Sequence, residues 1–333
     1  MIRFFADANY DFIGVRRYAY GITAILFVIS VVALIAWGFN YSIEFSGGTL
    51  VRVKAAQEVD VARLRSALEA QGITGPEITT IGSSGGYLIR ARTAKAGSDA
   101  DNTQVTAAAV GAALDQAVGP GKYVLEGSGA VGPKVASELQ GKALSAILLS
   151  FLAVLGYLAI RFEWRFGLAA IAATAHDIIL TIGFIALMRL EVSLVVVGAV
   201  LSMVGYSLND TIIIFDRVRE NLHKYKRDHF IDIINRSINE TLPRSVLTHG
   251  TTLATLTSLA IFGGEVIRPF ALVMFFGVFT GTFSSIYIAG PVLIWVEQKW
   301  PGAEARGVKP GVKAAVQPPS TIGRQPSTVK ADA

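Results

Sequence analysis

The sequence predicts a polytopic α-helical membrane protein with six transmembrane helices and a small α+β, ferredoxin-like domain between the first and second helices. Three observations indicate this fold class. The chain of 333 residues is 52% hydrophobic and only 17% charged, which is too apolar for a soluble protein. Six apolar windows are long enough to cross a bilayer. The long segment between the first two windows has the periodicities of strands and amphipathic helices.

The six apolar windows approach the length of about 20 residues that a helix needs to cross a bilayer. They lie at residues 19–37, 143–160, 166–187, 192–215, 246–263 and 270–296. Arg16 and Arg17 precede the first window, as in a signal peptide, but the window is too long and WGFNYSIEF offers no small-residue cleavage site. We therefore expect a retained first span after an N-terminal segment of residues 1–18.

The basic residues beside the spans predict the orientation of the chain. They gather before the first span, between the second and third spans, and between the fourth and fifth spans: Arg3, Arg16, Arg17, Arg161, Arg165, Arg217, Arg219, Lys224, Lys226, Arg227, Arg236 and Arg244. The short alternate connections carry only Arg189 and Arg268. Cytoplasmic loops carry an excess of Lys and Arg, so we expect both termini in the cytoplasm. The segment 38–142 then lies on the opposite side of the membrane.

The segment 38–142 has the pattern of a small βαββαβ domain with a joint at its end. Strands are predicted at 49–55, 77–83, 87–93 and 122–127, and helices at 61–72 and 103–119. The helix VARLRSALEAQG ends at Gly72, and SSGG connects the two middle strands as a hairpin. This order of elements is typical of a ferredoxin-like sandwich.

The C-terminal segment, residues 297–333, is expected to be a cytoplasmic tail. From about residue 301 it is rich in Pro, Gly, Lys and Ser and has almost no large apolar side chains. Such a composition cannot bury enough apolar surface to fold, so we expect disorder and assign the tail no function.

The sequence offers no enzyme chemistry. GSGAVG at 127–132 has the GxGxxG form, but a dinucleotide fold needs a βαβ unit and an acid about 20 residues later, whereas a membrane span follows here. Pro133 stands where a phosphate-binding loop needs Lys, so we expect a flexible joint before the second span. Without Cys and with four scattered His, no thiol chemistry, cofactor or metal cluster is expected. No nucleic-acid partner is expected either. If the protein does work, the energy for it must come from a partner or from an ion gradient.

Ionisable residues inside the spans are the candidates for handling ions. Asp177 lies near the middle of span three beside His176, Asp210 lies in the cytoplasmic half of span four, and Arg244 stands at the cytoplasmic mouth of span five. A carboxylate in hydrocarbon costs about 2.5–3.5 kcal/mol, so such residues face the bundle interior and mark ion pathways. Desolvation raises the pKa of a carboxyl and a nearby cation lowers it. These opposing effects suit a reversible proton carrier. Asp210 is the sharpest candidate, and a structural hydrogen bond between helices is the alternative for both acids.

Two further patterns concern how the last spans pack. In span five, polar residues recur every three or four positions, as a hydrated path or a helix contact would require: Arg244, Thr248, Thr251, Thr252, Thr255 and Ser258. In span six, Gly277, Gly281, Ser285 and Ala289 form a ladder of small residues, which we interpret as a site of close helix packing. Asp216 and Arg217 are interpreted as an ordinary solvated helix end.

The motifs in their order resemble those of a known family. They are NYSIEFSGGTL, SGAVGPKVASEL, RFEWRFGLAAIAATAHDIILTIG, GYSLNDTIIIFDRVREN and INETLPRSVLTHGTTLATL, and the resemblance covers residues 12–296. Together they are similar to the SecF family of the bacterial Sec protein-export accessory complex, a half-unit of the resistance-nodulation-division type.

The resemblance implies a multi-pass protein of the bacterial inner membrane with a periplasmic domain after the first span. The expected partners are SecD as a second six-helix half, the SecYEG channel and the translocating preprotein, with protons of the proton-motive force as the coupling ion. In this family the Asp of the fourth-span motif and the Arg at the start of the fifth span are tied to proton transport. These positions are Asp210 and Arg244 here, and Asp177 lies in a further family motif.

The hypothesis for the mechanism is a cycle in which Asp210 takes a proton from the periplasmic side and releases it to the cytoplasm, with Arg244 favouring the ionised form. Two rival functions stay open. One is a proton-coupled small-molecule exporter half-unit of the same superfamily, which predicts a substrate pocket in the outer domain. The other is a non-conducting membrane assembly scaffold, in which Asp210 is a structural pin.

Overall fold

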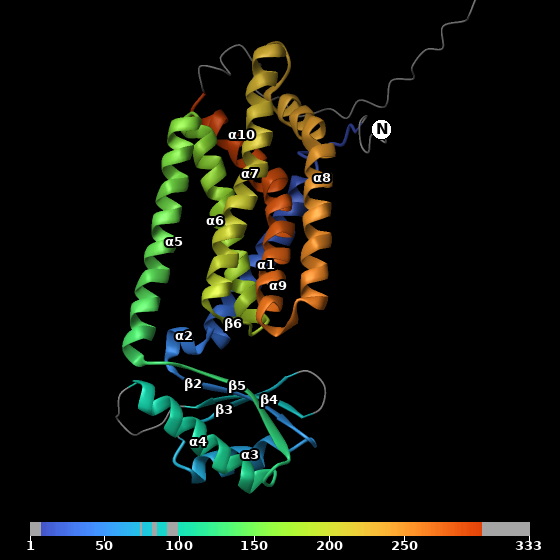
Figure 1. The fold of residues 1–333 in the computed structure, drawn as a ribbon. Helices are drawn as coiled ribbons and strands as arrows, with labels where there is room; N and C mark the ends of the chain where they lie inside the picture. Colours follow the sequence, from blue (N-terminus) through green and yellow to red (C-terminus); the bar gives the residue numbers. More distant parts are fainter. Residues whose placement is uncertain (1–7, 74, 82–84, 92–98, 302–333) are drawn as a thin grey trace, which may run out of the picture.

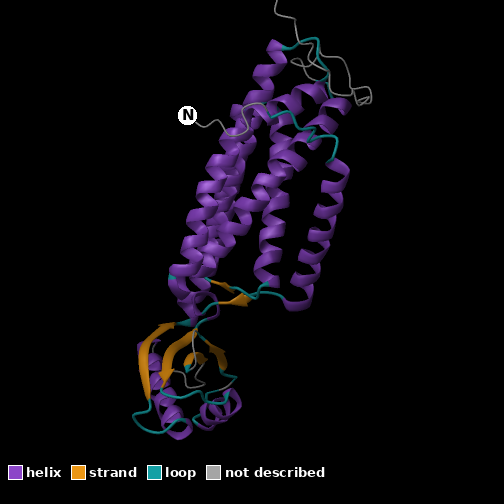
Figure 2. Ribbon diagram, turned by 90° about the vertical axis from the view of Figure 1, so that its right-hand side faces the viewer, coloured by secondary structure: helices purple, strands orange, loops and turns teal. Residues whose placement is uncertain are grey.

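The computed structural model describes residues 8–73, 75–81, 85–91 and 99–301 of the chain. A bundle of long helices carries a small α/β domain at one end (Figure 1). Seen at 90° to that view, the strands lie beyond the end of the bundle and short segments connect the two parts (Figure 2). The predicted tail beyond residue 301 and the first two residues of the predicted SSGG turn, 83–84, lie outside the described residues.

Six helices of the described chain are long and apolar enough to cross a membrane, as predicted. They are α1 (Arg16–Trp37), α5 (Pro133–Arg161), α6 (Trp164–Leu187), α7 (Leu194–Lys224), α8 (Phe230–Phe262) and a last span that begins with α9 (Gly264–Ser284). Several extend well past the predicted windows, because an apolar window marks only the part suited to hydrocarbon. α5 starts ten residues before the window 143–160, and α8 starts sixteen residues before the window 246–263.

The last span is made of three segments instead of one regular helix. After α9 comes a single π-helical turn, η1 (Ser285–Ala289), and then α10 (Gly290–Lys299). A π turn inside an α-helix is rare and is frequently found at functional sites. The turn begins and ends at the last two members of the predicted ladder of small residues, Ser285 and Ala289.

Glycines let two pairs of spans approach one another closely. A Cβ atom at Gly183 of α6 would lie 2.1 Å from Ser30 Cβ of α1. A Cβ atom at Gly277 of α9 would lie 2.0 Å from Met203 Cγ of α7. The predicted role of Gly277 in helix packing is thus confirmed. By contrast, α5 stands at the edge of the bundle, and only 6% of its apolar window is buried within the chain (Figure 1).

The small domain contains the predicted elements in the predicted order. Its strands are β2 (Gly48–Ala55), β3 (Glu77–Thr80), β4 (Gly86–Ala91) and β5 (Tyr123–Val131), and its helices are α3 (Val61–Ala70) and α4 (Asp99–Ala117). The strands form an antiparallel sheet in the order β3-β4-β2-β5. Both helices cover one face of this sheet (Figure 1), where alternate strand residues such as Val51 and Ile89 are fully buried.

The prediction of a flexible joint at GSGAVG was wrong for most of that stretch. Residues 127–131 belong to β5 and pair with β2 from Arg52 back to Gly48. The sequence pattern missed this because the backbone groups of Gly and Ala pair in a sheet without the large side chains that signal a strand. A paired strand is also not a phosphate-binding loop, so the nucleotide alternative fails on geometry.

A second, two-stranded sheet that was not predicted ties the domain to the bundle. β1 (Asn40–Tyr41) follows α1 and pairs in parallel with β6 (Glu191–Val192), which lies between α6 and α7. The Arg189 guanidinium donates to the carbonyl of Trp37 at 2.7 Å, and Arg90 of the domain forms an ion pair with Glu191. The short helix α2 (Ile43–Ser46) leads from this sheet into β2. The domain is thus connected to the bundle by more than its two chain crossings.

Candidate functional site

Asp210 lies inside the bundle on α7, with only 3% of its surface exposed. Each carboxylate oxygen accepts one hydrogen bond. Ser245 Oγ of α8 donates to Oδ1 at 2.6 Å, and Ser285 Oγ of the π turn donates to Oδ2 at 2.9 Å. Both donors are neutral hydroxyls, so the carboxyl is bridged to two other segments without an ion pair among the described residues.

Asp177 is fully buried on α6 and has three partners. Ser207 of α7 and Ser284 of α9 donate to its Oδ2 at 2.5 and 2.6 Å, and its Oδ1 lies 2.9 Å from Nδ1 of His176. The other ring nitrogen of His176 is buried and has no hydrogen-bond partner within the described part of the chain. Asp177 therefore joins three spans and is more fully paired than Asp210.

Two consecutive serines bring the two acids into one network. Ser284, the last residue of α9, bonds to Asp177, and Ser285, the first residue of the π turn, bonds to Asp210. On α7, Ser207 lies about one turn before Asp210. Ser207 donates to Asp177, and Asp210 accepts from Ser245. The network spans α6, α7, α8 and the last span. The sequence did not predict either serine of the last span as a hydrogen-bond donor, and Ser285 was interpreted as a member of a ladder of small packing residues.

Arg244 is not part of this network. It directly precedes Ser245 on α8, but its side chain is exposed and makes no hydrogen bond or ion pair with any described residue. Consecutive residues of an α-helix point about 100° apart, so when Ser245 faces Asp210 its neighbour faces outward. The structure thus places Arg244 at the level of Asp210 along the helices but on another face of α8.

The polar stripe predicted on span five also faces outward for the most part. Thr248, Thr251 and Thr255 are exposed, and the hydroxyls of Thr251 and Thr255 donate to carbonyls of their own helix. The stripe that faces the bundle consists instead of Thr241, Ser245 and His249, spaced by four residues. His249 was missed because a single His between a Thr and a Gly carries no pattern.

The residues toward the basic, C-terminal end of α7 form a solvated helix end, as interpreted from the sequence. Asp216 forms a half-exposed ion pair with Arg161 of α5 at 2.8 Å. Arg217 bonds to Glu240 of α8 and to Glu220, each at 2.6 Å. Neither residue contacts Asp210 or Asp177 through a hydrogen bond, so this surface is separate from the buried network.

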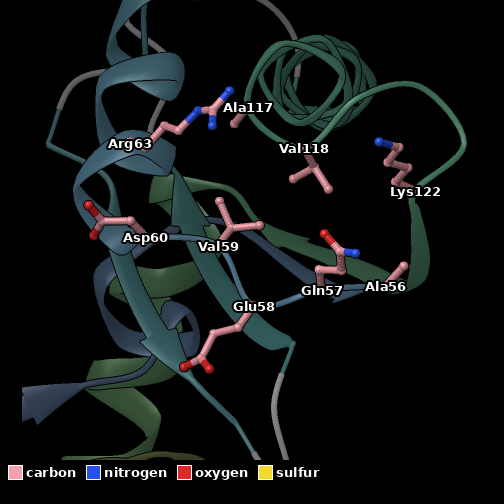
Figure 3. Close-up of a pocket in the computed structure, with 9 residues that line it drawn as sticks. All are labelled: Ala56, Gln57, Glu58, Val59, Asp60, Arg63, Ala117, Val118 and Lys122. Carbon is pink, nitrogen blue, oxygen red and sulfur yellow. The ribbon is translucent and has the colours of Figure 1, made fainter.

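A hollow of about 440 Å³ lies in the small domain between the β2–α3 connection and the end of α4 (Figure 3). It is lined by Ala56, Gln57, Glu58, Val59, Asp60, Arg63, Ala117, Val118 and Lys122. Figure 3 shows the carboxylates of Glu58 and Asp60 pointing in different directions, with Arg63 and Lys122 on separate sides. Polar groups that converge on one point are the mark of a small-molecule site, and they do not do so here.

Comparison with known proteins decides the family. Residues 112–299 match the model of the C-terminal region of the protein export membrane protein SecD/SecF, and residues 32–59 match the SecD/SecF GG motif. The protein translocase subunit SecF of Gemmatimonas aurantiaca is 49% identical over 326 residues, which is 94% of this chain and 96% of that protein. The chain belongs to the SecF family. The resemblance predicted from the motifs is confirmed.

Other SecF and SecDF proteins extend the comparison. SecF of Rickettsia felis is 39% identical over 86% of this chain and 91% of its own length. The crystal structure of SecDF, a translocon-associated membrane protein from Thermus thermophilus, matches with a TM-score of 0.78 and 35% identity. That match covers 89% of this chain but only 40% of the SecDF chain. SecF membership gives the protein a role in protein export as a multi-pass membrane subunit.

The region matched by the SecD/SecF GG motif includes the turn between α2 and the sheet. Gly47 and Gly48 have φ angles of 70° and 120°, a conformation that side chains with a Cβ atom rarely adopt. These two glycines turn the chain from α2 into β2. The family motif therefore coincides with the connection that joins the first span to the domain.

Proposed function

We propose that this SecF-family chain works with SecD to use the proton-motive force for preprotein export through SecYEG, and that Asp210 carries the proton. The observation that carries the proposal is the environment of Asp210. The carboxyl is buried in the middle of a membrane bundle and held by two serine hydroxyls. A hydroxyl can donate to a carboxylate and accept from a protonated carboxyl, so both states of Asp210 find partners in the same place.

The energetics of the site suit a reversible carrier. Burial disfavours the charged carboxylate, while the two donated hydrogen bonds favour it. One elementary charge crossing a potential of 100 mV releases about 2.3 kcal/mol, which is comparable with the strength of a hydrogen bond to a charged group. Proton uptake and release at Asp210 can therefore change which helix contacts are favoured. The proton is proposed to enter from the periplasmic side and leave to the cytoplasm.

Arg244 is proposed to act in a second arrangement of α8. A rotation of this helix by about 100° would replace Ser245 by Arg244 at the carboxylate of Asp210. The guanidinium would then favour the ionised form and expel the proton. Ser245 holds the site in the present arrangement through its 2.6 Å hydrogen bond.

The outward stripe of Arg244, Thr248, Thr251 and Thr255 supports a protein partner within the membrane. A charged side chain at this depth is costly when it faces lipid. A second six-helix half that covers this face of α8 would give Arg244 and the hydroxyls a polar surface, and the SecDF match makes SecD the partner we propose.

Asp177 is proposed to serve mainly as the fixed end of the network. Its three partners come from α6, α7 and α9, and one of them is an imidazole that can itself carry charge. Such a set of contacts holds helices together more firmly than the two hydroxyls of Asp210 do. Any transfer of protons through Asp177 would pass along Ser284 and Ser285 toward Asp210.

The orientation follows from the basic residues and the domain. The βαββαβ order and the antiparallel strand order support a ferredoxin-like sandwich, which we place in the periplasm. The basic end of α7 then lies at the cytoplasmic face of the inner membrane, with both termini on that side.

The two rival functions are less well supported. A small-molecule exporter needs convergent polar groups in the outer domain, and the hollow of Figure 3 lacks them. In a scaffold without ion coupling, Asp210 would serve only to join helices by hydrogen bonds, and its hydroxyl partners permit that role. The scaffold is therefore the alternative that an experiment must separate.

Proton flux and preprotein export in vesicles containing the complete complex test the proposal. Asp210→Asn keeps the shape of the side chain and removes titration, so we expect both activities to be lost while the complex still assembles. Asp216→Asn is the matched control, because it lies on the same helix in a half-exposed ion pair outside the network. Normal flux and export in Asp210→Asn would contradict the proposal, and export that proceeds without proton flux in both the parent and Asp210→Asn would favour the scaffold.

A further inference from the structure

His249 is a buried titratable group that the function described above does not use. It lies on α8 four residues after Ser245, toward the end of the helix nearer the small domain, and is 6% exposed. Four residues correspond to about 6 Å along a helix axis. The imidazole thus lies one turn from the hydroxyl that holds Asp210, on the side from which the proton is proposed to enter.

The hydrogen bonding of this imidazole is incomplete. Its Nδ1 is buried and has no partner among the residues that the structure describes. A buried polar atom without a partner costs about 1–3 kcal/mol, and in natural proteins such an atom calls for an explanation. A histidine that served only to fill space could be replaced by an apolar residue at no such cost.

Tyr206 and Thr252 complete the surroundings of His249. The rings of Tyr206 and His249 lie 5.4 Å apart, and the Tyr206 hydroxyl bonds to Thr252 Oγ1 at 2.7 Å and to the Thr248 carbonyl at 3.2 Å. Tyr206 lies one turn before Asp210 on α7. Along the α7–α8 contact, from the domain side inward, the hydroxyls of Tyr206 and Thr252 thus come first. The imidazole of His249 follows, and then the carboxyl of Asp210.

His249 and Asp210 are also linked electrostatically, since each lies within range of the charge of the other. The other charged or titratable groups at this contact are few. α7 contributes Tyr206 and Asp210, and the neighbouring cation of α8 is the outward-facing Arg244. In the sequence of α9 and the π turn, no titratable residue stands between Arg268 and Tyr287. The imidazole and the carboxyl are thus the neighbouring pair of ionisable groups at this contact.

We propose that His249 is a proton carrier that takes protons from the domain side of the membrane and passes them to Asp210. In the step, an imidazolium N–H bond breaks and a carboxyl O–H bond forms, so that a cation and an anion become two neutral groups. The Asp210 carboxyl is then neutral when Arg244 and the hydroxyls of Ser245 and Ser285 act on it in the later steps of the proposed cycle. The inference rests on the proposed function, because it names the group that supplies the proton to the same carboxyl.

The test uses His249→Gln in the complete complex in vesicles, with proton flux measured at a series of pH values on the domain side. Glutamine can hydrogen-bond but does not titrate near neutral pH. We expect flux to fall at least about tenfold and its pH profile to lose one titration. His223→Gln is the matched control, since His223 is an exposed residue near the end of α7 whose one hydrogen-bond partner within the described part of the chain is the carbonyl of Arg219. The control should keep both the rate and the pH profile.

A second measurement keeps the inference testable if His249→Gln fails to assemble. In the unaltered complex with histidine labelled for NMR, the imidazole signal of His249 should have a titration curve that changes in Asp210→Asn. An unchanged curve would overturn the inference, as would a His249→Gln complex with the flux and pH profile of the parent. If Asp210→Asn itself conducts normally, the proposed function fails. If Asp210→Asn is inactive and His249→Gln is normal, only this inference fails.

Discussion

Ser285 donates a hydrogen bond to Asp210 at 2.9 Å from the first residue of a π turn. The residue before it, Ser284, bonds to Asp177 at 2.6 Å. The change from α to π geometry thus occurs between the residues that serve the two buried acids. A π turn can convert to a regular α turn by shifting one residue in register, which makes this segment suitable as an element with two arrangements.

Replacing Ser285 by Ala removes one of the two donors to the Asp210 carboxylate. A hydrogen bond to a charged group contributes about 1.5–3 kcal/mol, so the ionised state loses that stabilisation. The step that regenerates the carboxylate should slow, and proton flux in vesicles should fall by about tenfold or more. Thr282→Ala is the control, since the Thr282 hydroxyl bonds only to the Val278 carbonyl of its own helix. Equal flux in the two variants would show that the Ser285 hydroxyl does not act on Asp210.

Asp177→Ala should destabilise the bundle more than it alters proton transfer. The change leaves the Ser207 hydroxyl and the His176 ring without their acceptor, while the Ser284 hydroxyl can still donate to the Gly281 carbonyl at 3.2 Å. Each unsatisfied buried group costs about 1–3 kcal/mol, so the thermal midpoint of the purified complex should fall by several degrees. Asp177→Asn keeps one acceptor oxygen and should lose less. A normal midpoint with abolished flux would instead make Asp177 a proton carrier.

The spans and the elements of the small domain were predictable because each is a local pattern. An apolar window gives a span, and alternation in TLVRVKA gives a strand, whatever the rest of the chain does. Asp210 and Asp177 were also predictable as candidates, since an acid inside an apolar window is costly wherever it lies. Their partners were not, because the hydroxyls come from helices far away in the sequence.

The faces of α8 show where the sequence was ambiguous. Thr and Ser residues recur on two sides of this helix, and a spacing of three or four residues fits either side. The predicted stripe fits a hydrated path or a helix contact and faces outward for the most part, whereas packing against α7 selects Thr241, Ser245 and His249. The strand at 127–131 and the β1–β6 pair were missed for a related reason, since their ladders depend on a distant partner.

Tyr123 should make the small domain sensitive to alkaline pH. Its hydroxyl lies 3.1 Å from both the Gly111 carbonyl and Asp115 Oδ1 of α4. Burial raises the pKa of Tyr123 above the ordinary 10.0, and the hydrogen bond with Asp115 raises this pKa further. The folded domain thus holds the phenol neutral, and the stability gained is present below pH 10 and is lost as the pH rises through the folded pKa.

Tyr123→Phe tests this dependence. The variant should lose about 0.5–1.5 kcal/mol of stability at neutral pH, seen as faster hydrogen exchange in α4, and its stability should respond less to alkaline pH. Tyr18→Phe is the control, because Tyr18 is 79% exposed at the start of α1. If Tyr123→Phe and the parent lose stability equally above pH 10, the Tyr123 hydroxyl does not cause the alkaline response.

Gly277→Ala should separate α7 from α9 and thereby disturb the site. The new Cβ atom would lie 2.0 Å from Met203 Cγ and 3.0 Å from Met203 Cβ, atoms too close to the backbone to move aside without shifting the helix. Overpacking of this kind costs about 1–3 kcal/mol. Because Asp210 follows Met203 on α7 and Ser285 follows Gly277 on the last span, the 2.9 Å hydrogen bond between them should lengthen and proton flux should fall.

The control for Gly277→Ala is Gly156→Ala on α5, where a Cβ atom would meet no atom within 4 Å. Alanine is favoured over glycine inside a helix by about 0.5–1 kcal/mol, so this variant should keep or slightly raise the thermal midpoint of the complex. The two substitutions add the same methyl group to the middle of a span, and they differ in the neighbouring helix that the methyl group meets. A fall in the thermal midpoint of both variants would mean that any replacement of glycine in the spans destabilises the complex. An unchanged midpoint and flux in Gly277→Ala would mean that α7 and α9 have room to move apart without affecting Asp210.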